Sequence, residues 1–127
     1  MAYVWVALGG ALGSMARYGS SGLAVRWLGA GFPWGTLFVN VAGSFAIGLL
    51  TTLVAADGRP LLGNDARAFV IVGVLGGFTT FSSFSLETLN LARSGQLGAA
   101  GANVALSLVV CLVAAWLGFA STALLNR

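Results

Sequence analysis

Four hydrophobic stretches follow one another along the chain, and charged residues lie almost entirely between them. The stretches without a charged side chain are 2–16, 27–56, 68–86 and 94–126. A membrane-spanning helix needs about 20 mostly apolar residues. The last two stretches therefore each allow one helix, and the second allows one with some tilt. The first is short by itself, so we expect its helix to continue past Arg17, which then lies towards the far end.

Turn-forming residues between the stretches set the expected helix ends. Glycines and Pro33 separate the first two, glycines and Pro60 separate the next two, and Gly95 precedes the last. The predicted helices are 2–28, 33–56, 66–93 and 97–125. Asp65 is the expected N-cap of the third, since an aspartate oxygen accepts from free amides at a helix start. The pattern predicts an all-α integral membrane protein, one domain over 1–127, with four transmembrane helices and a first span retained in the mature protein.

Composition supports this class and excludes several functions. Only 7% of the residues are charged and 58% are hydrophobic, whereas an ordinary soluble domain has about 25% charged residues. The arginines are scattered and lysine is absent, so there is no patch for nucleic acid. With no histidine and one cysteine, Cys111, the chain has almost no ligands for zinc or haem. No nucleophile–base pair can be assembled, and an enzyme is the least expected class.

The positive charges are shared almost equally between the two expected sides of the membrane. The side with both termini carries Arg59, Arg67 and Arg127, and the opposite side carries Arg26, Arg93 and, depending on its depth, Arg17. Unequal Lys and Arg counts in short loops orient a membrane protein. This chain has almost no such bias, so it could insert both ways and pack antiparallel with a second copy. The alternative is that a count over so few charges is noise.

The third predicted helix has an interruption in mid-span. Gly73, Gly76 and Gly77 precede the segment 79–85, in which five of the seven residues are serine or threonine. A membrane helix breaks only where protein or a water-filled cavity satisfies the freed backbone groups, and broken helices expose such groups to ions in transporters and channels. The alternative is that the hydroxyls bond to their own helix and only kink it. The coincidence of glycines, hydroxyls and mid-span position favours a functional break.

Polar side chains in the second and fourth helices are candidates for lining an ion path. Asn40 lies well inside its helix, and Ser44, four residues later, extends the same face. An amide can hold helices together in a membrane or offer two N–H donors to an anion, and the residues alone leave both roles open. In the fourth helix Asn103 is nearer the start, and Ser107 and Cys111 share one face.

Two phenylalanines and two charged residues complete the candidates. Phe81 and Phe84 are three residues apart and share a face of the helix. Aromatic residues at this spacing ordinarily serve packing, although the edge of an aromatic ring carries a partial positive charge and would tolerate a small anion beside it. Glu87 is the only acid within a span, and intramembrane carboxylates are functional candidates. Because Glu87 and Arg17 lie near helix ends, the alternative is that their side chains extend to water.

Three stretches together point to a known family. They are 9–18, GGALGSMARY, in the first helix, 35–45, GTLFVNVAGSF, in the second, and 76–85, GGFTTFSSFS, at the interruption. In this order, and in a chain of this length, they resemble the small fluoride channels of the CrcB/Fluc family. The resemblance covers essentially the whole chain.

The resemblance implies an antiparallel, dual-topology homodimer with two separate anion pathways and a structural sodium ion at its centre. Carried onto this chain, the sodium ligands are the backbone carbonyls of Gly76 and Thr79 and their partner-subunit copies. The expected anion-pathway residues are Arg17, Asn40, Thr80, Phe81, Ser82, Ser83, Phe84, Glu87 and Ser107. Cys111 stands where the family has a hydroxyl, and a thiol is the weaker donor.

The expected function is passive exit of fluoride through the cell membrane, which lowers cytoplasmic fluoride and protects against its toxicity. A dry path must replace the tight hydration of this anion with donors, at sites weak enough to release it. One rival is a small proton-coupled multidrug exporter, which needs a carboxylate deep in the first helix, and this helix has none. Another is a non-transporting subunit whose polar residues only hold helices together.

Overall fold

The computed structural model describes residues 1–53 and 58–125, and these residues form a bundle of long helices. The elements are α1 (Ala2–Leu28), α2 (Trp34–Thr51), α3 (Asn64–Arg67), η1 (Ala68–Leu75), α4 (Gly76–Phe78), α5 (Phe81–Arg93) and α6 (Leu97–Leu125). The predicted first and fourth helices have the observed bounds. The second ends at Thr51 rather than at 56, and the last part of that predicted helix, with Asp57, lies outside the described residues, as does Arg127.

The start of the third span differs from the prediction. Its first helical residue is Asn64, the N-cap is Gly63, and no side chain caps it. The expectation that Asp65 is the N-cap is therefore wrong, because Asp65 already lies in the first turn. An acidic residue in that position still interacts favourably with the free amides of the helix start.

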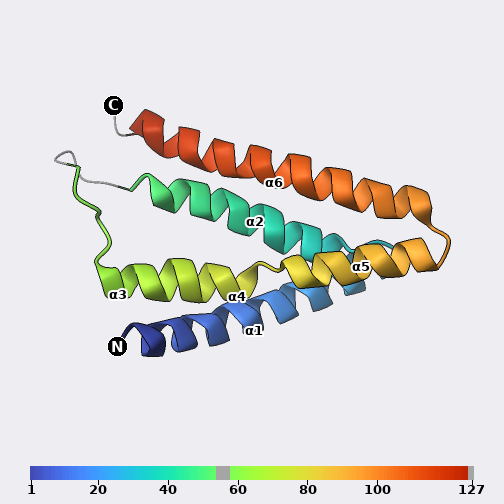
Figure 1. Cartoon of the computed structure of the whole chain (residues 1–127), viewed down its shortest axis with the longest axis horizontal. Coiled ribbons are helices and arrows are strands. Elements are labelled where there is room, and N and C mark those ends of the chain that lie inside the picture. The colour runs from blue at the N-terminus through green and yellow to red at the C-terminus, as the bar shows by residue number, and fades with distance from the viewer. Residues whose placement is uncertain (54–57, 126–127) are drawn as a thin grey trace.

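The helices lie in two pairs that run along the long axis (Figure 1). α2 packs along α6, and α1 packs along η1 and α4, while α5 contacts α6 and the start of α2. Met1 lies at the same end as the last turns of α2 and α6, and the α1–α2 and α5–α6 connections lie at the other end. Successive long segments therefore run in opposite directions along this axis.

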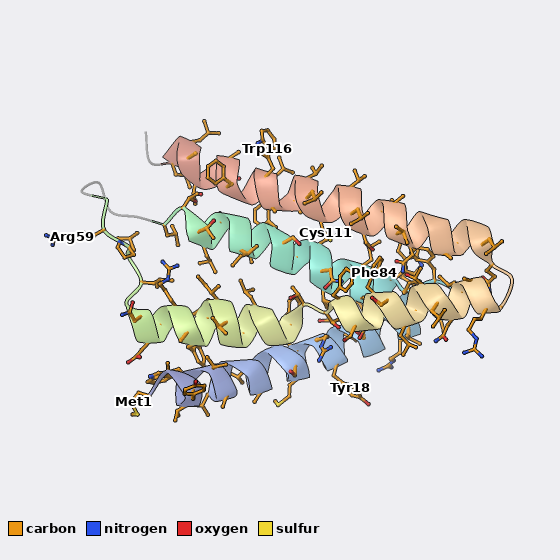
Figure 2. The ribbon with its side chains drawn as sticks, viewed as in Figure 1. Met1, Tyr18, Arg59, Phe84, Cys111 and Trp116 are labelled. Carbon is orange, nitrogen blue, oxygen red and sulfur yellow. The ribbon has the colours of Figure 1, made fainter. Side chains whose placement is uncertain are left out.

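Among residues 1–53 and 58–125, three segments are long and apolar enough to cross a membrane: Trp34–Thr51, Asn64–Arg93 and Leu97–Leu125. α1 is a helix of 27 residues but is not among them, since glycines, serines, Arg17 and Arg26 dilute its apolar residues. Most large apolar side chains in the described parts of the chain are exposed, as lipid and partner helices require. Trp116 and Tyr18 project outwards from α6 and α1 (Figure 2).

Glycines allow the closest helix contacts. A methyl group added to Gly13 would meet the carbonyl oxygen of Val74, and one added to Gly77 would lie 2.6 Å from the carbonyl oxygen of Gly10. The same holds where α2 crosses α6, at Gly48 and Gly118. Small residues let membrane helices approach in this way, so these four glycines serve the packing of the helices.

The interruption of the third span is confirmed, but it lies just after the glycine pair. Gly76 and Gly77 remain helical within α4, whereas Thr79 and Thr80 are extended, with ψ of 156° and 120°. α5 then begins at Phe81. Before the break, η1 is a wider π-helical stretch of eight residues, a form that is rare and is frequently found at functional sites.

Candidate functional site

The break is held open by a side chain from another helix. Oδ1 of Asn40, on α2, accepts from the backbone N–H of Thr80 at 2.7 Å, and Nδ2 of Asn40 donates to the carbonyl oxygen of Thr80 at 2.9 Å. The Asn40 amide thus replaces the helical partners of both backbone groups, as a membrane break requires. The second N–H of Nδ2 takes no part in these two bonds.

This arrangement frees two carbonyl groups. In a continuous helix the Thr80 N–H would bond to Gly76, but here it donates to Asn40. The Ser83 N–H would bond to Thr79, but it donates instead to Oγ1 of Thr80, the N-cap of α5, at 3.2 Å. The carbonyls of Gly76 and Thr79 therefore lose the amide partners that a continuous helix would supply. A carbonyl without an amide donor is a suitable ligand for a hard cation.

Most of the predicted residues line one hollow between α2, α6 and both halves of the broken third span, which we call the central hollow. It has a volume of about 430 Å³. Its polar and aromatic lining includes Asn40, Ser44, Gly76, Thr79, Thr80, Phe81, Phe84, Ser107 and Cys111. None of these side chains is charged, so the hollow offers an anion neutral donors and aromatic rings.

The aromatic residues and the α6 face meet in this hollow. The rings of Phe81 and Phe84 lie 5.3 Å apart between centroids at 51°, and Phe81 is 75% exposed although it lies in mid-span. Phe84 points towards the side of α6 that carries Cys111 (Figure 2). The predicted shared face of Ser107 and Cys111 is confirmed, since both line the central hollow.

A second hollow of about 270 Å³ lies at the α1–α2 end and contains Glu87. Oε1 of Glu87 accepts from Oγ1 of Thr36 at 2.9 Å. Oε2 is buried, and no hydrogen-bond partner for it lies among the described residues. Ser21 and Asn90 also line this hollow.

The remaining predicted residues have different surroundings. Ser82 and Ser83 lie at the start of α5, where each hydroxyl is 3.2 Å from Oγ1 of Thr80, so the three hydroxyls form one cluster. Arg17 is partly buried on α1 and lines neither hollow. The structure therefore brings together all the predicted anion-pathway residues except Arg17 and Glu87 around the break.

Thr36 lines the second hollow and is not among the site residues predicted from the sequence. It is 7% exposed on α2 and binds Glu87. The signal was present, because Thr36, Asn40 and Ser44 are spaced by four residues and so form one polar face of α2.

A multi-pass helical membrane protein with a broken span beside an uncharged hollow that contains a few polar groups has the architecture of an ion channel or transporter. Residues 4–119 match the family described as "CrcB-like protein, Camphor Resistance (CrcB)". The chain belongs to this family, which is one of ion channels and not of enzymes.

Three bacterial relatives are each named "Fluoride-specific ion channel FluC". The one from Opitutus terrae is 60% identical over 98% of this chain and 94% of its own length. The one from Rhodospirillum rubrum is 54% identical over 100% and 98%, and the one from Methylocella silvestris is 50% identical over 100% and 97%. The resemblance inferred from the three motifs is thus confirmed.

Proposed function

We propose that this protein is a fluoride-selective channel of the cell membrane, through which fluoride leaves the cytoplasm passively. The observation that carries the proposal is the central hollow, where Asn40, Ser107, the Thr80 hydroxyl and the rings of Phe81 and Phe84 converge without a charged side chain. The names of the relatives support fluoride as the ion.

The chemistry follows from the donors. Hydroxyl and amide protons take the place of water around the anion, and the positive ring edges add a weaker attraction. No single group binds the ion strongly, so the ion can move from one site to the next and leave. A path through this hollow towards the Ser82–Ser83–Thr80 cluster and Glu87 needs no energy source.

The functional unit in this proposal is an antiparallel homodimer with two pores. Each chain forms a single domain over 1–127 and crosses the membrane four times, with α1 as the additional span. The nearly equal charge at the two ends supports insertion in both orientations. The exposure of Phe81 in mid-span also supports the dimer, since a second copy would cover it.

A structural sodium ion at the dimer centre is part of the proposal. The carbonyls of Gly76 and Thr79 fit such an ion, since the amides that would bond to them in a continuous helix are used by Asn40 and Thr80. Among the described residues no group of three His, Cys, Asp or Glu side chains could hold a metal, and backbone oxygens suit a hard monovalent cation. When bound, the ion supplies a positive charge between the two chains.

The test is anion efflux from liposomes that contain the purified protein and are loaded with fluoride or with chloride. We expect fast fluoride efflux and chloride efflux close to that of empty vesicles. Equal rates for both ions, or no fluoride flux above empty vesicles, would contradict the channel. Parallel dimers alone in a crosslinking experiment would contradict the antiparallel dimer.

A further inference from the structure

Asn103, on α6, is the most deeply buried polar side chain among the described residues, with 1% of its surface exposed. A buried amide in a membrane span is unfavourable unless its groups are bonded. Its partner is on another helix, because Nδ2 of Asn103 donates to Oγ1 of Thr88 on α5 at 2.9 Å. The function proposed above makes no use of this residue.

The bond from Asn103 continues at both ends to residues of the central hollow. Oγ1 of Thr88 donates to the carbonyl oxygen of Phe84 at 2.7 Å. On the other side, the Ser107 hydroxyl points to Oδ1 of Asn103 at a longer 3.5 Å. Phe84 and Ser107 both line the central hollow. Asn103 therefore links α6 to α5, the two helices that carry Ser107 and Phe84 in the lining of the central hollow.

α5 depends on such contacts more than the other long helices do. It has 13 residues, and the extended Thr79 and Thr80 separate it from α4, so the preceding helix does not fix its rotation. Asn40 and Thr36 join α5 and its N-cap to α2. Asn103 joins it to α6, on the side of the Phe84 ring.

We propose that Asn103 is a positioning residue of the anion path: through Thr88 it sets the rotation of α5, and so the position of the Phe84 ring relative to Ser107. The inference rests on the proposed fluoride function for its transport consequence. Its structural part, the position of the ring, is independent of transport.

The transport test uses Thr88→Val, which removes the hydroxyl and keeps the shape, and Asn103→Leu, which removes the amide. Each should lower fluoride efflux at least about tenfold, the order expected when a buried polar partner is lost. The double variant should be no slower than the slower single variant, since both break one chain of bonds. Thr88→Ser, which keeps the hydroxyl, should stay within about twofold of the wild type.

Ser121→Ala is the matched control, because the Ser121 hydroxyl bonds only to Leu117 of its own helix among the described residues, at 2.7 Å. Thr88→Val at the wild-type rate, or losses that multiply in the double variant, would overturn the proposal. If Asn103→Leu does not fold, the Thr88 pair decides alone.

A spectroscopic measurement separates this inference from the channel function. With 4-fluorophenylalanine at position 84, the ¹⁹F resonance should shift in Thr88→Val and stay unchanged in Ser121→Ala and Thr88→Ser. An unchanged resonance in Thr88→Val would overturn the positioning role. A wild-type protein that passes no fluoride would contradict the proposed function instead, whatever the resonance shows.

Discussion

The side-chain amide of Asn40 hydrogen-bonds both backbone groups of Thr80, accepting from the N–H at 2.7 Å and donating to the carbonyl at 2.9 Å. An asparagine side chain has the same donor and acceptor groups as a peptide bond, so it can take the place of one. Asn40 is therefore a structural part of the break as well as a candidate donor to the anion.

Replacement of Asn40 should separate these contributions. Asn40→Leu removes both bonds to Thr80, and Asn40→Asp removes the donor and adds a negative charge beside the anion path. We expect fluoride efflux to fall roughly tenfold or more in Asn40→Leu, because two buried backbone groups lose their partner, and further in Asn40→Asp, because like charges repel. Liposome efflux at matched dimer content measures both. Equal effects of the two variants would contradict the contribution of charge.

The glycine contacts predict a difference between two similar substitutions in α1. Gly13→Ala places a methyl group against the Val74 carbonyl, whereas Gly19→Ala meets no atom within 4 Å. Overpacking of this kind costs about 1–3 kcal/mol, so the thermal midpoint of Gly13→Ala in detergent should be clearly lower. Gly19→Ala is the matched control and should equal or exceed the wild type, since alanine favours the helix. A similar loss in both variants would count against the close contact.

The Thr36–Glu87 bond predicts opposite results for two neutral replacements of Glu87. Glu87→Gln keeps an acceptor for the Thr36 hydroxyl, so fluoride efflux should remain at or above the wild-type rate. Glu87→Leu leaves that hydroxyl without its acceptor, and efflux should fall by roughly tenfold. Efflux measured at low and high ionic strength would check both. If Glu87→Gln were as slow as Glu87→Leu, the acceptor role of Glu87 would be refuted.

The freed carbonyls of Gly76 and Thr79 predict that sodium stabilises the assembled protein. A ligand that binds only the folded state raises its stability by mass action. The thermal midpoint of purified protein should therefore rise by several degrees when about 100 mM sodium replaces N-methylglucamine at constant ionic strength. Identical midpoints in sodium and in N-methylglucamine would contradict a sodium site.

The helices could be predicted well from the sequence, because charges and turn residues mark their ends clearly. The spans 2–28 and 97–125 have the observed bounds. The position of the break was harder to predict. Two adjacent glycines indicate a weak helix, yet Gly76 and Gly77 stay helical, and Gly77 makes the close contact with α1, while the threonines after them become extended.

The missed features are those that depend on residues far apart in the sequence. The Asn40–Thr80 and Thr36–Glu87 bonds join residues 40 and 51 positions apart, and no local pattern specifies such pairs. The π-helical stretch Ala68–Leu75 consists of apolar residues and glycine. A π-helix differs from an α-helix in its hydrogen-bonding pattern. In so short and uniformly apolar a segment, this difference produces no recognisable periodicity of side chains.

The distance in sequence between Asn40 and Thr80 has a consequence for biosynthesis. Lipid offers no hydrogen-bonding groups, so a newly inserted segment 64–93 satisfies its backbone best as one continuous helix, with the Thr80 amide bonded to Gly76. We therefore expect the interruption to form when α2 docks and Asn40 supplies the replacement amide, which bonds to Thr80 in the folded protein. On this expectation the span inserts as an ordinary helix, and its secondary structure is completed by its tertiary assembly with α2.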